Sequence, residues 1–278
     1  MFVRLLYKLL HYEMRRGVVN MRTHQNGSTL IIVLGLLVVI TLIGTLAMKN
    51  SLVSLNIATN SQAQQIMTQS SDSAFFSLED PTQLGRHIMG NGVLGYLKGD
   101  ANKERELVFC MRSDDVRFFD LAKASLIYWP SGAAGPKNND IGTNGYCNMT
   151  TANHYTTGRR AVMTQVAVRY TSTPTKPFEF YQRGTDGQTA KLEQAERIMV
   201  HSTSLMPTLA NGATNTQINT CLSAHLNLAS EPVDASFDAT KPEQVTANTN
   251  GKVSVSQCLT ALGVPHTTQV VEYKLQQN

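Results

Sequence analysis

The feature that most constrains this chain is an apolar run of nineteen residues without a charge, which begins at Leu30 and ends at Met48. At about 1.5 Å per residue in an α-helix, such a run spans roughly the 30 Å hydrocarbon core of a bilayer. A cleaved secretory signal fits poorly, because its apolar region is only about 7 to 15 residues long and ends in a small-residue cleavage site that this run lacks. The run therefore predicts a helix that crosses a membrane once.

The helical pattern continues beyond the apolar run. Apolar residues recur at helical spacing as far as Met67, and no proline lies between Ser28 and Asp80. The sequence therefore predicts one helix over residues 28–80, about 75 Å long, with its transmembrane part at residues 30–48. The first half of this helix is apolar all round and the second half is amphipathic. A plain membrane anchor has no reason to continue in register so far.

The residues at the start of this helix resemble a known family. A short polar segment, residues 21–27, ends in Gly27, and Ser28 opens the apolar helix. This arrangement resembles a type III signal, which a prepilin peptidase cuts on the cytoplasmic side while the apolar helix is retained; here the cut would fall between Gly27 and Ser28. The continuation over residues 45–65 is similar to the start of PilX-type minor pilins of type IV pili. The resemblance covers about residues 21–80.

The resemblance implies a lollipop-shaped subunit, with a long N-terminal helix and a globular head. Before assembly such a subunit crosses the bacterial inner membrane once with its head in the periplasm, and afterwards it lies at the pilus tip on the cell surface. Its expected partners are other minor pilins, the major pilin, the prepilin peptidase and the inner-membrane assembly platform, with a tip adhesin as a further candidate. No cofactor is expected.

Two positions depart from the common pilin pattern. Counted from Ser28, the fifth residue is Ile32, where most pilins carry a Glu that is thought to pair with the N-terminal amine of a neighbouring subunit. A lone buried charge costs several kcal/mol, and Ile32 cannot neutralise a neighbour's amine. In the family, subunits without the acid are found near the filament tip. Lys49 stands where many pilins have a helix-breaking Pro. Gly35 and Gly44 each lower the stability of a helix by about 1 kcal/mol relative to Ala. Glycine is common in ordinary membrane helices, so we assign these two residues no special role.

Two starts of translation are open. A start at Met1 adds residues 1–12, which could form a basic amphipathic helix at the membrane interface. A start at Met21 leaves a leader of the usual short length, and we favour it. Residues 1–27 carry five Lys and Arg against one acid. Basic residues beside a membrane helix stay on the cytoplasmic side, so these residues are expected to form a cytoplasmic leader and the remaining chain faces outward.

The charge balance argues against a nucleic-acid surface. The whole chain has 24 Lys and Arg and 20 Asp and Glu. The first 27 residues hold five of the bases and one of the acids, so 19 of each remain and the mature chain has no net charge. Binding to nucleic acid requires Lys and Arg clustered on one face. We therefore expect no direct nucleic-acid partner.

Four cysteines, Cys110, Cys147, Cys221 and Cys258, all follow the membrane helix, and none forms a C-x-x-C pair. Metal and thioredoxin-like roles are therefore disfavoured, whereas an oxidising periplasm favours two disulfides. Pairing Cys110 with Cys147 and Cys221 with Cys258 gives two loops of equal separation, 37 residues. Each loop would contribute about 3 to 4 kcal/mol on the chain-entropy model. Nested pairing is the main competitor. The tetrapeptides that start at Cys221 and Cys258 are similar, Cys-Leu-Ser-Ala and Cys-Leu-Thr-Ala. The similarity is either chance or a repeated turn-and-helix element.

The head, residues 81–278, is expected to be α+β, with an antiparallel sheet laid against the second half of the long helix and with long loops. Strands are predicted over residues 106–112, 161–170, 177–182 and 267–275. Residues 191–199 have helical propensity, although pairing as a strand in the sheet could override that propensity. Polar tracts rich in Asn, Thr and Gly predict loops over residues 131–145, 209–219 and 231–251.

No recognisable set of catalytic residues is present. The chain has no G-x-S-x-G, no H-E-x-x-H and no P-loop, and its seven His lack metal-ligand spacing. Asp114, Asp115 and Asp140 lack the spaced oxygen ligands of an EF-hand loop. We therefore expect no catalytic residue and no metal site.

Two classes of function remain. The first is a structural and assembly protein, a minor pilin that primes or caps the filament. Its near relative is the large pseudopilin of type II secretion, which also lacks the acid at the fifth position. The second is a signal-anchored periplasmic enzyme with a dispersed active site. We favour the first.

Overall fold

A computed structural model describes residues 28–102, 105–115, 117–130, 133–171, 196–227 and 253–275. The leader with Gly27, the predicted strand at 177–182 and the loop tract at 231–251 lie outside the described residues. The chain divides into two compact units between Ala58 and Thr59, and we describe each unit by itself. The predicted division into a leader, a helix over residues 28–80 and a head over residues 81–278 stays a prediction.

Helix α2 (Ser28–Leu78) is uninterrupted over 51 residues, as the missing prolines predict. The helix ends at Leu78 for a local reason, because Pro81 disfavours a helical conformation at the residue before it. Asp80 then caps the next helix, α3 (Pro81–Ile88), by accepting a hydrogen bond from the Thr82 amide. Among the described residues, α2 is the one helix long and apolar enough to cross a membrane, judged by length and composition.

The first unit contains the apolar part of α2. Its large apolar side chains, from Leu30 to Ile57, are all between 49% and 75% exposed. Two hydroxyls in this part are satisfied within the helix, since Thr41 donates to the Val38 carbonyl and Thr45 to the Leu42 carbonyl. These two hydroxyls therefore need no water, which suits a helix in hydrocarbon.

The second unit is built on one antiparallel sheet of five strands in the order β2-β1-β3-β4-β5. The strands are β1 (Glu106–Cys110), β2 (Ser125–Ile127), β3 (Met163–Thr171), β4 (Glu196–Leu205) and β5 (His266–Leu275). The antiparallel sheet and the long helix confirm the α+β class. Three of the predicted strands are present with small shifts at their ends. The helical propensity at residues 191–199 is misleading where the structure describes it, because residues 196–199 belong to β4 and pair with both β3 and β5.

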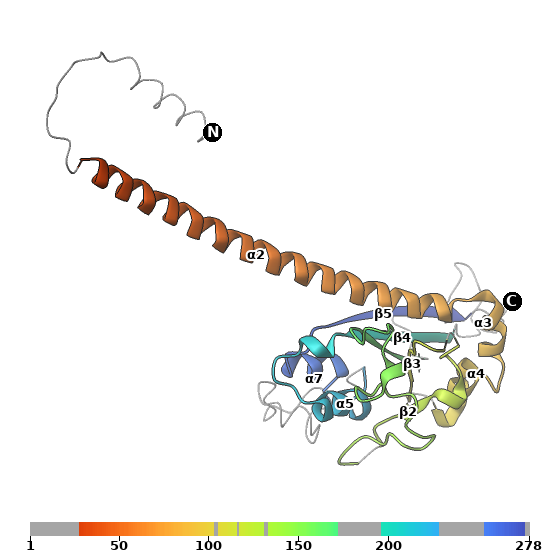
Figure 1. Cartoon of the computed structure of the whole chain (residues 1–278). Helices are drawn as coiled ribbons and strands as arrows, with labels where there is room; N and C mark the ends of the chain where they lie inside the picture. Colours follow the sequence, from red (N-terminus) through yellow and green to blue (C-terminus); the bar gives the residue numbers. More distant parts are fainter. Residues whose placement is uncertain are drawn as a thin grey trace, which may run out of the picture. The chain divides into compact units, whose positions relative to one another are not determined.

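One face of the sheet packs against the last turns of α2 and against α4 (Val93–Lys98). The side chains of β3 alternate, so that Val166 and Val168 point to this face. They meet Phe75 and Leu78 of α2 in a single apolar cluster. Burial of a large apolar side chain stabilises a fold by about 1.5 to 3 kcal/mol, so this cluster is the main attachment of the helix to the sheet. Figure 1 shows α3 and α4 at the end of the sheet where α2 terminates.

Two short helices, α5 (Asn215–Ala224) and α7 (Val255–Ala261), lie together at the other end of the sheet (Figure 1). Each begins with a capping box. The hydroxyl of the cap residue, Thr214 or Ser254, accepts a hydrogen bond from the backbone amide of the third helical residue, and the side chain of that residue, a Gln in both helices, accepts one from the backbone amide of the cap residue. The loop predicted over residues 209–219 is therefore wrong beyond Thr214. Polar residues there form the first turns of a helix, because the capping box satisfies its free amides. Short 3₁₀ turns complete the described elements: Asp100–Asn102, Leu121–Lys123, Ala152–His154 and Pro207–Leu209.

A chain of hydroxyl groups also joins α2 to the sheet. Ser71 of α2 is hydrogen-bonded to Ser204 of β4 at 2.7 Å, and Ser204 to Thr164 of β3 at 2.7 Å. Thr164 is also bonded to Ser70 at 2.8 Å, and Ser70 donates to Thr156 at 3.3 Å. Ser71, Thr164 and Ser204 are fully buried. A buried hydroxyl without a hydrogen-bond partner is costly. These hydrogen-bonded hydroxyls therefore favour one position of the helix along the sheet over any shifted one.

Ser204→Ala removes the central hydroxyl of this chain and leaves Ser71 and Thr164 with one partner fewer. We expect the free energy of unfolding of the second unit to fall by about 1 to 3 kcal/mol, the usual cost of a buried polar group that loses its partner. Chemical denaturation of the full chain in detergent measures this. The matched control is Ser61→Ala on an exposed position of α2, which should have almost no effect. Equal stability of the Ser204 variant and the control would show that the hydroxyl chain does not hold the helix.

Candidate functional site

The residues that the sequence singles out for membrane and filament contacts all lie in the first 21 residues of α2. They are Leu30, Ile32, Gly35, Gly44 and Met48. Ile32 is 63% exposed and lies one turn from Gly35, on the same face of the helix. A Cβ added at Gly35 or Gly44 would meet no atom within 4 Å. These glycines are therefore not required by packing within the described chain.

This apolar part of α2 is the candidate functional site, as a candidate interaction surface. Monomeric soluble proteins rarely expose continuous apolar patches larger than a few hundred Å². Here every large apolar side chain from Leu30 to Ile57 is exposed, around the whole circumference of the helix. Lys49 is the only charged residue between Ser28 and Asp72. A helix that is apolar all round is stable only among lipids or other apolar helices.

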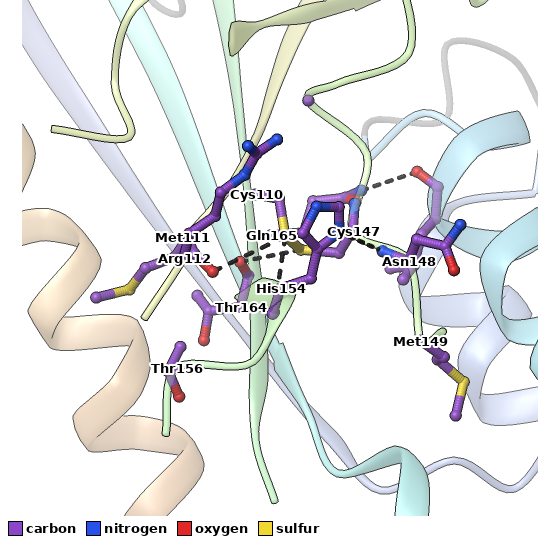
Figure 2. The surroundings of a disulfide bond; sticks show 12 residues. Cys110, Met111, Arg112, Cys147, Asn148, Met149, His154, Thr156, Thr164 and Gln165 are labelled. Carbon is purple, nitrogen blue, oxygen red and sulfur yellow. Dashed lines mark hydrogen bonds between the residues drawn. A yellow bond between two sulfur atoms is a disulfide. The ribbon is translucent and has the colours of Figure 1, made fainter. Parts of the chain in front are cut away.

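The first disulfide joins Cys110, at the end of β1, to Cys147 in the loop between β2 and β3, with 4.9 Å between their Cα atoms. Figure 2 shows the side chains of Gln165 and His154 beside this bond. The Cys147 amide donates to the Gln165 side-chain oxygen at 3.0 Å, and the Gln165 amide group donates to the Leu222 carbonyl of α5 at 2.8 Å. Gln165 therefore connects the disulfide loop to α5.

His154 completes the surroundings of the first disulfide. Its Nδ1 atom accepts a hydrogen bond from the Asn148 amide at 2.9 Å. Burial, and secondarily the positive charge of Arg112, hold the pKa of His154 below its usual range. The ring is therefore neutral at pH 7 and acts as an acceptor, which is a structural role in this loop.

The second disulfide joins Cys221 of α5 to Cys258 of α7, with 5.6 Å between the Cα atoms. Both Cα separations lie within the range in which disulfides form. The two tetrapeptides that echo each other in sequence form the last turns of α5 and α7. All four half-cystines belong to one apolar cluster with Leu205 and Leu222, so both bonds brace the same end of the sheet. Of the three possible connectivities, the structure has the one in which both separations are 37 residues.

Other candidate residues do not come together. Among the residues that the structure describes, no three His, Cys, Asp or Glu side chains are grouped in a way that could hold a metal ion. Asp114 accepts a hydrogen bond from Asn153, and Asp115 pairs with Lys123, so both carboxylates take part in local contacts. Asp140 accepts a hydrogen bond from the Tyr128 hydroxyl at 2.7 Å.

Comparison with known proteins gives no match: neither a protein-family model, nor a curated protein, nor a solved structure matches this chain. The resemblance to minor pilins therefore depends on the residues at 21–80 alone.

The disulfide connectivity is directly testable. Non-reducing peptide mapping of protein from the cell envelope should recover two linked peptides, one with Cys110 and Cys147 and one with Cys221 and Cys258, and no free thiol. A peptide that links Cys147 to Cys221 would contradict the structure of this end of the sheet. Removal of either pair by substitution with Ala should lower the free energy of unfolding by about 3 to 4 kcal/mol on the chain-entropy model.

Proposed function

We propose that this chain is a structural subunit of a type IV pilus, a PilX-type minor pilin that primes assembly or belongs to the tip complex. One observation carries this proposal. A helix that is apolar all round over a membrane-spanning length continues without a break into a segment that packs on a sheet. A simple anchor needs only the first part. A filament subunit needs both, because the same helix must hold the head and enter a bundle of other helices.

The proposed mechanism depends on the similarity of two environments. Before assembly the apolar part of α2 lies in the inner membrane, with the head in the periplasm. During assembly it leaves the lipid and packs among the helices of other subunits. Lipid tails and Leu side chains are about equally apolar, so this transfer has little hydrophobic cost and depends on side-chain packing. The fully apolar circumference of the helix suits both environments.

Ile32 supports a position at the tip. In a filament interior, a carboxylate at this position would pair with the N-terminal amine of a neighbouring subunit. Ile32 offers no such partner, so a subunit stacked against it would bury an unpaired ammonium group at a cost of several kcal/mol. This cost does not arise where no neighbour requires the acid. The proposed place is therefore the end of the filament that is assembled first.

The proposed partners follow from this place. They are other minor pilins, the major pilin, a tip adhesin, the assembly platform of the inner membrane and the prepilin peptidase that would cut before Ser28. A large pseudopilin of type II secretion is the nearest alternative, because the absence of the acid at Ile32 fits it equally well. The two differ in the filament they enter.

Substitutions of Ile32 test the mechanism. Ile32→Lys places an ammonium group beside the N-terminal amine and should reduce piliation strongly. On membrane-insertion scales a Lys costs about 2.5 to 3.5 kcal/mol at the helix centre, and less near an end. Ile32→Glu should be tolerated in part, because a carboxyl group can pair with an amine or become protonated. Electron microscopy and a shear assay measure the number of surface pili.

Two controls make this test specific. Val53→Lys makes the same chemical change beyond the apolar run and should leave insertion into the inner membrane intact. Deletion of the gene should reduce the number of pili while the prepilin peptidase and major pilin remain at normal levels. Membrane levels of each variant are measured in parallel, which separates failed insertion from failed assembly. Normal piliation in the deletion strain or in the Ile32→Lys variant would refute the proposal.

A further inference from the structure

The second unit contains a cleft of about 550 Å³ between the last turns of α2, helix α3 and the loop at residues 117–121. This volume lies within the range of binding pockets for small ligands and short peptides. None of the residues that the sequence singled out lies in this cleft. Its walls come from segments that are distant in sequence, so the sequence alone gave no sign of it.

Four charged side chains line the cleft: Asp80, Arg86, Arg117 and Asp120. Asp80 accepts hydrogen bonds from the amide and the hydroxyl of Thr82, which lower the pKa of the carboxyl group. Asp120 accepts a hydrogen bond from the Ala122 amide, and its second oxygen lies 3.6 Å from Arg86. The Arg117 guanidinium has no hydrogen-bond or ion-pair partner among the residues that the structure describes. Arg86 and Asp120 offset each other, and the Asp80 carboxylate is held by the neutral donors of Thr82. Arg117 is therefore the cation of the lining that is available for an anionic ligand.

His87 adds no second charge. Its side chain is largely buried, and its ring meets the Phe119 ring edge-on, with 4.9 Å between the ring centroids. Burial, and then the nearby Arg86, lower the pKa of His87. At pH 7 the ring is therefore neutral and forms part of the cleft wall.

The cleft also has an exposed apolar side. Phe76 is 76% exposed and Met89 is 60% exposed, whereas the neighbouring Phe75 of α2 is buried against the sheet. Phe76, Met89 and Arg117 belong to residue types that are enriched at protein interfaces, whereas the Asp and Ser residues of the lining belong to types that are depleted there. The flexible thioether of Met adapts to different apolar side chains. Phe76, Met89 and Arg117 are therefore the part of the lining that suits a protein segment.

We propose that this cleft binds a short peptide segment of a partner protein, one that carries a carboxylate next to a large apolar side chain. Arg117 would hold the carboxylate through its two parallel N–H groups, which is the favoured geometry for this pair. Phe76 and Met89 would cover the apolar side chain. Ser73, Ser77 and Asn91 line the same cleft and offer polar groups to the peptide backbone. This inference goes beyond the proposed role in a filament and does not depend on it.

Two matched peptides test the site. The probes are acetyl-Leu-Glu-Leu-amide and acetyl-Leu-Gln-Leu-amide, titrated into the full chain in detergent micelles. Binding is followed through the methyl NMR signal of Met89, which a Met89→Leu variant identifies. We expect the Glu peptide to bind about tenfold more tightly than the Gln peptide, as is usual for a hydrogen bond between charged groups.

Variants then separate the two parts of the site. Arg117→Gln should abolish the preference for the Glu peptide, and Phe76→Ala should weaken both peptides by about tenfold. Both side chains are exposed, so neither substitution should disturb the fold. The matched control is Arg159→Gln, which removes an exposed Arg that does not line the cleft and should keep the preference.

Three outcomes would overturn the proposal. They are no binding of either peptide at millimolar concentration, equal affinity of both peptides for the unaltered chain, and the same loss in Arg117→Gln and Arg159→Gln. A third probe, glucuronate, distinguishes a sugar acid from a peptide: tighter binding of glucuronate than of the Glu peptide would also reject the proposal. Because the titration needs no pilus, its failure leaves the proposed filament role untouched.

Discussion

The structure depends on the apolar surface of one helix, α2, whose two parts have different surroundings. From Thr59 to Leu78, α2 packs on the sheet of its own chain and contributes Phe75 and Leu78 to the core. From Leu30 to Ile57, its large apolar side chains are exposed. No change within the head can bury this second surface, because it surrounds the helix. In the proposed function, lipid covers this surface before assembly and the helices of other subunits cover it afterwards.

Two further features fix the part of the chain that the helix holds. The buried hydroxyls of Ser71, Thr164 and Ser204 favour one register between helix and sheet, since a shift would separate hydrogen-bonded partners in the core. The disulfides brace the end of the sheet that carries Thr164 and Ser204, where α5 and α7 have few turns of their own. Both features would serve the proposed filament role, because force applied to α2 would reach the sheet through this interface.

Much of the fold could be predicted from the sequence where local rules decide. The absence of proline and the apolar spacing predicted α2 to within two residues of its end at Leu78. Strands β1, β3 and β5 followed from alternating apolar residues. The sequence did not predict β2, because its three residues are too few for a pattern. It also assigned helical propensity to residues that extend β4, where pairing with two neighbouring strands outweighs a weak intrinsic preference.

Interactions between distant residues were beyond sequence reasoning. Ser71 and Ser204 are hydrogen-bonded although 133 residues separate them, and single serines carry no signal of such a contact. The cleft beside Arg117 likewise combines residues from α2, α3 and a loop. The start of α5 is different, because Thr214 and Gln217 form a recognisable capping box. This motif by itself predicts a helix after Thr214, within the tract that polar composition assigns to a loop.

The mature N-terminus of the protein tests the central claim most directly. If the apolar helix belongs to a filament subunit, a prepilin peptidase removes the leader and leaves the whole helix. Mass spectrometry of the protein extracted from membranes should then find a chain that begins at Ser28, with the mass of one added methyl group on its amine. An intact leader, or a chain that begins after residue 48, would contradict the account, because the helix would then be a simple anchor or a cleaved secretion signal.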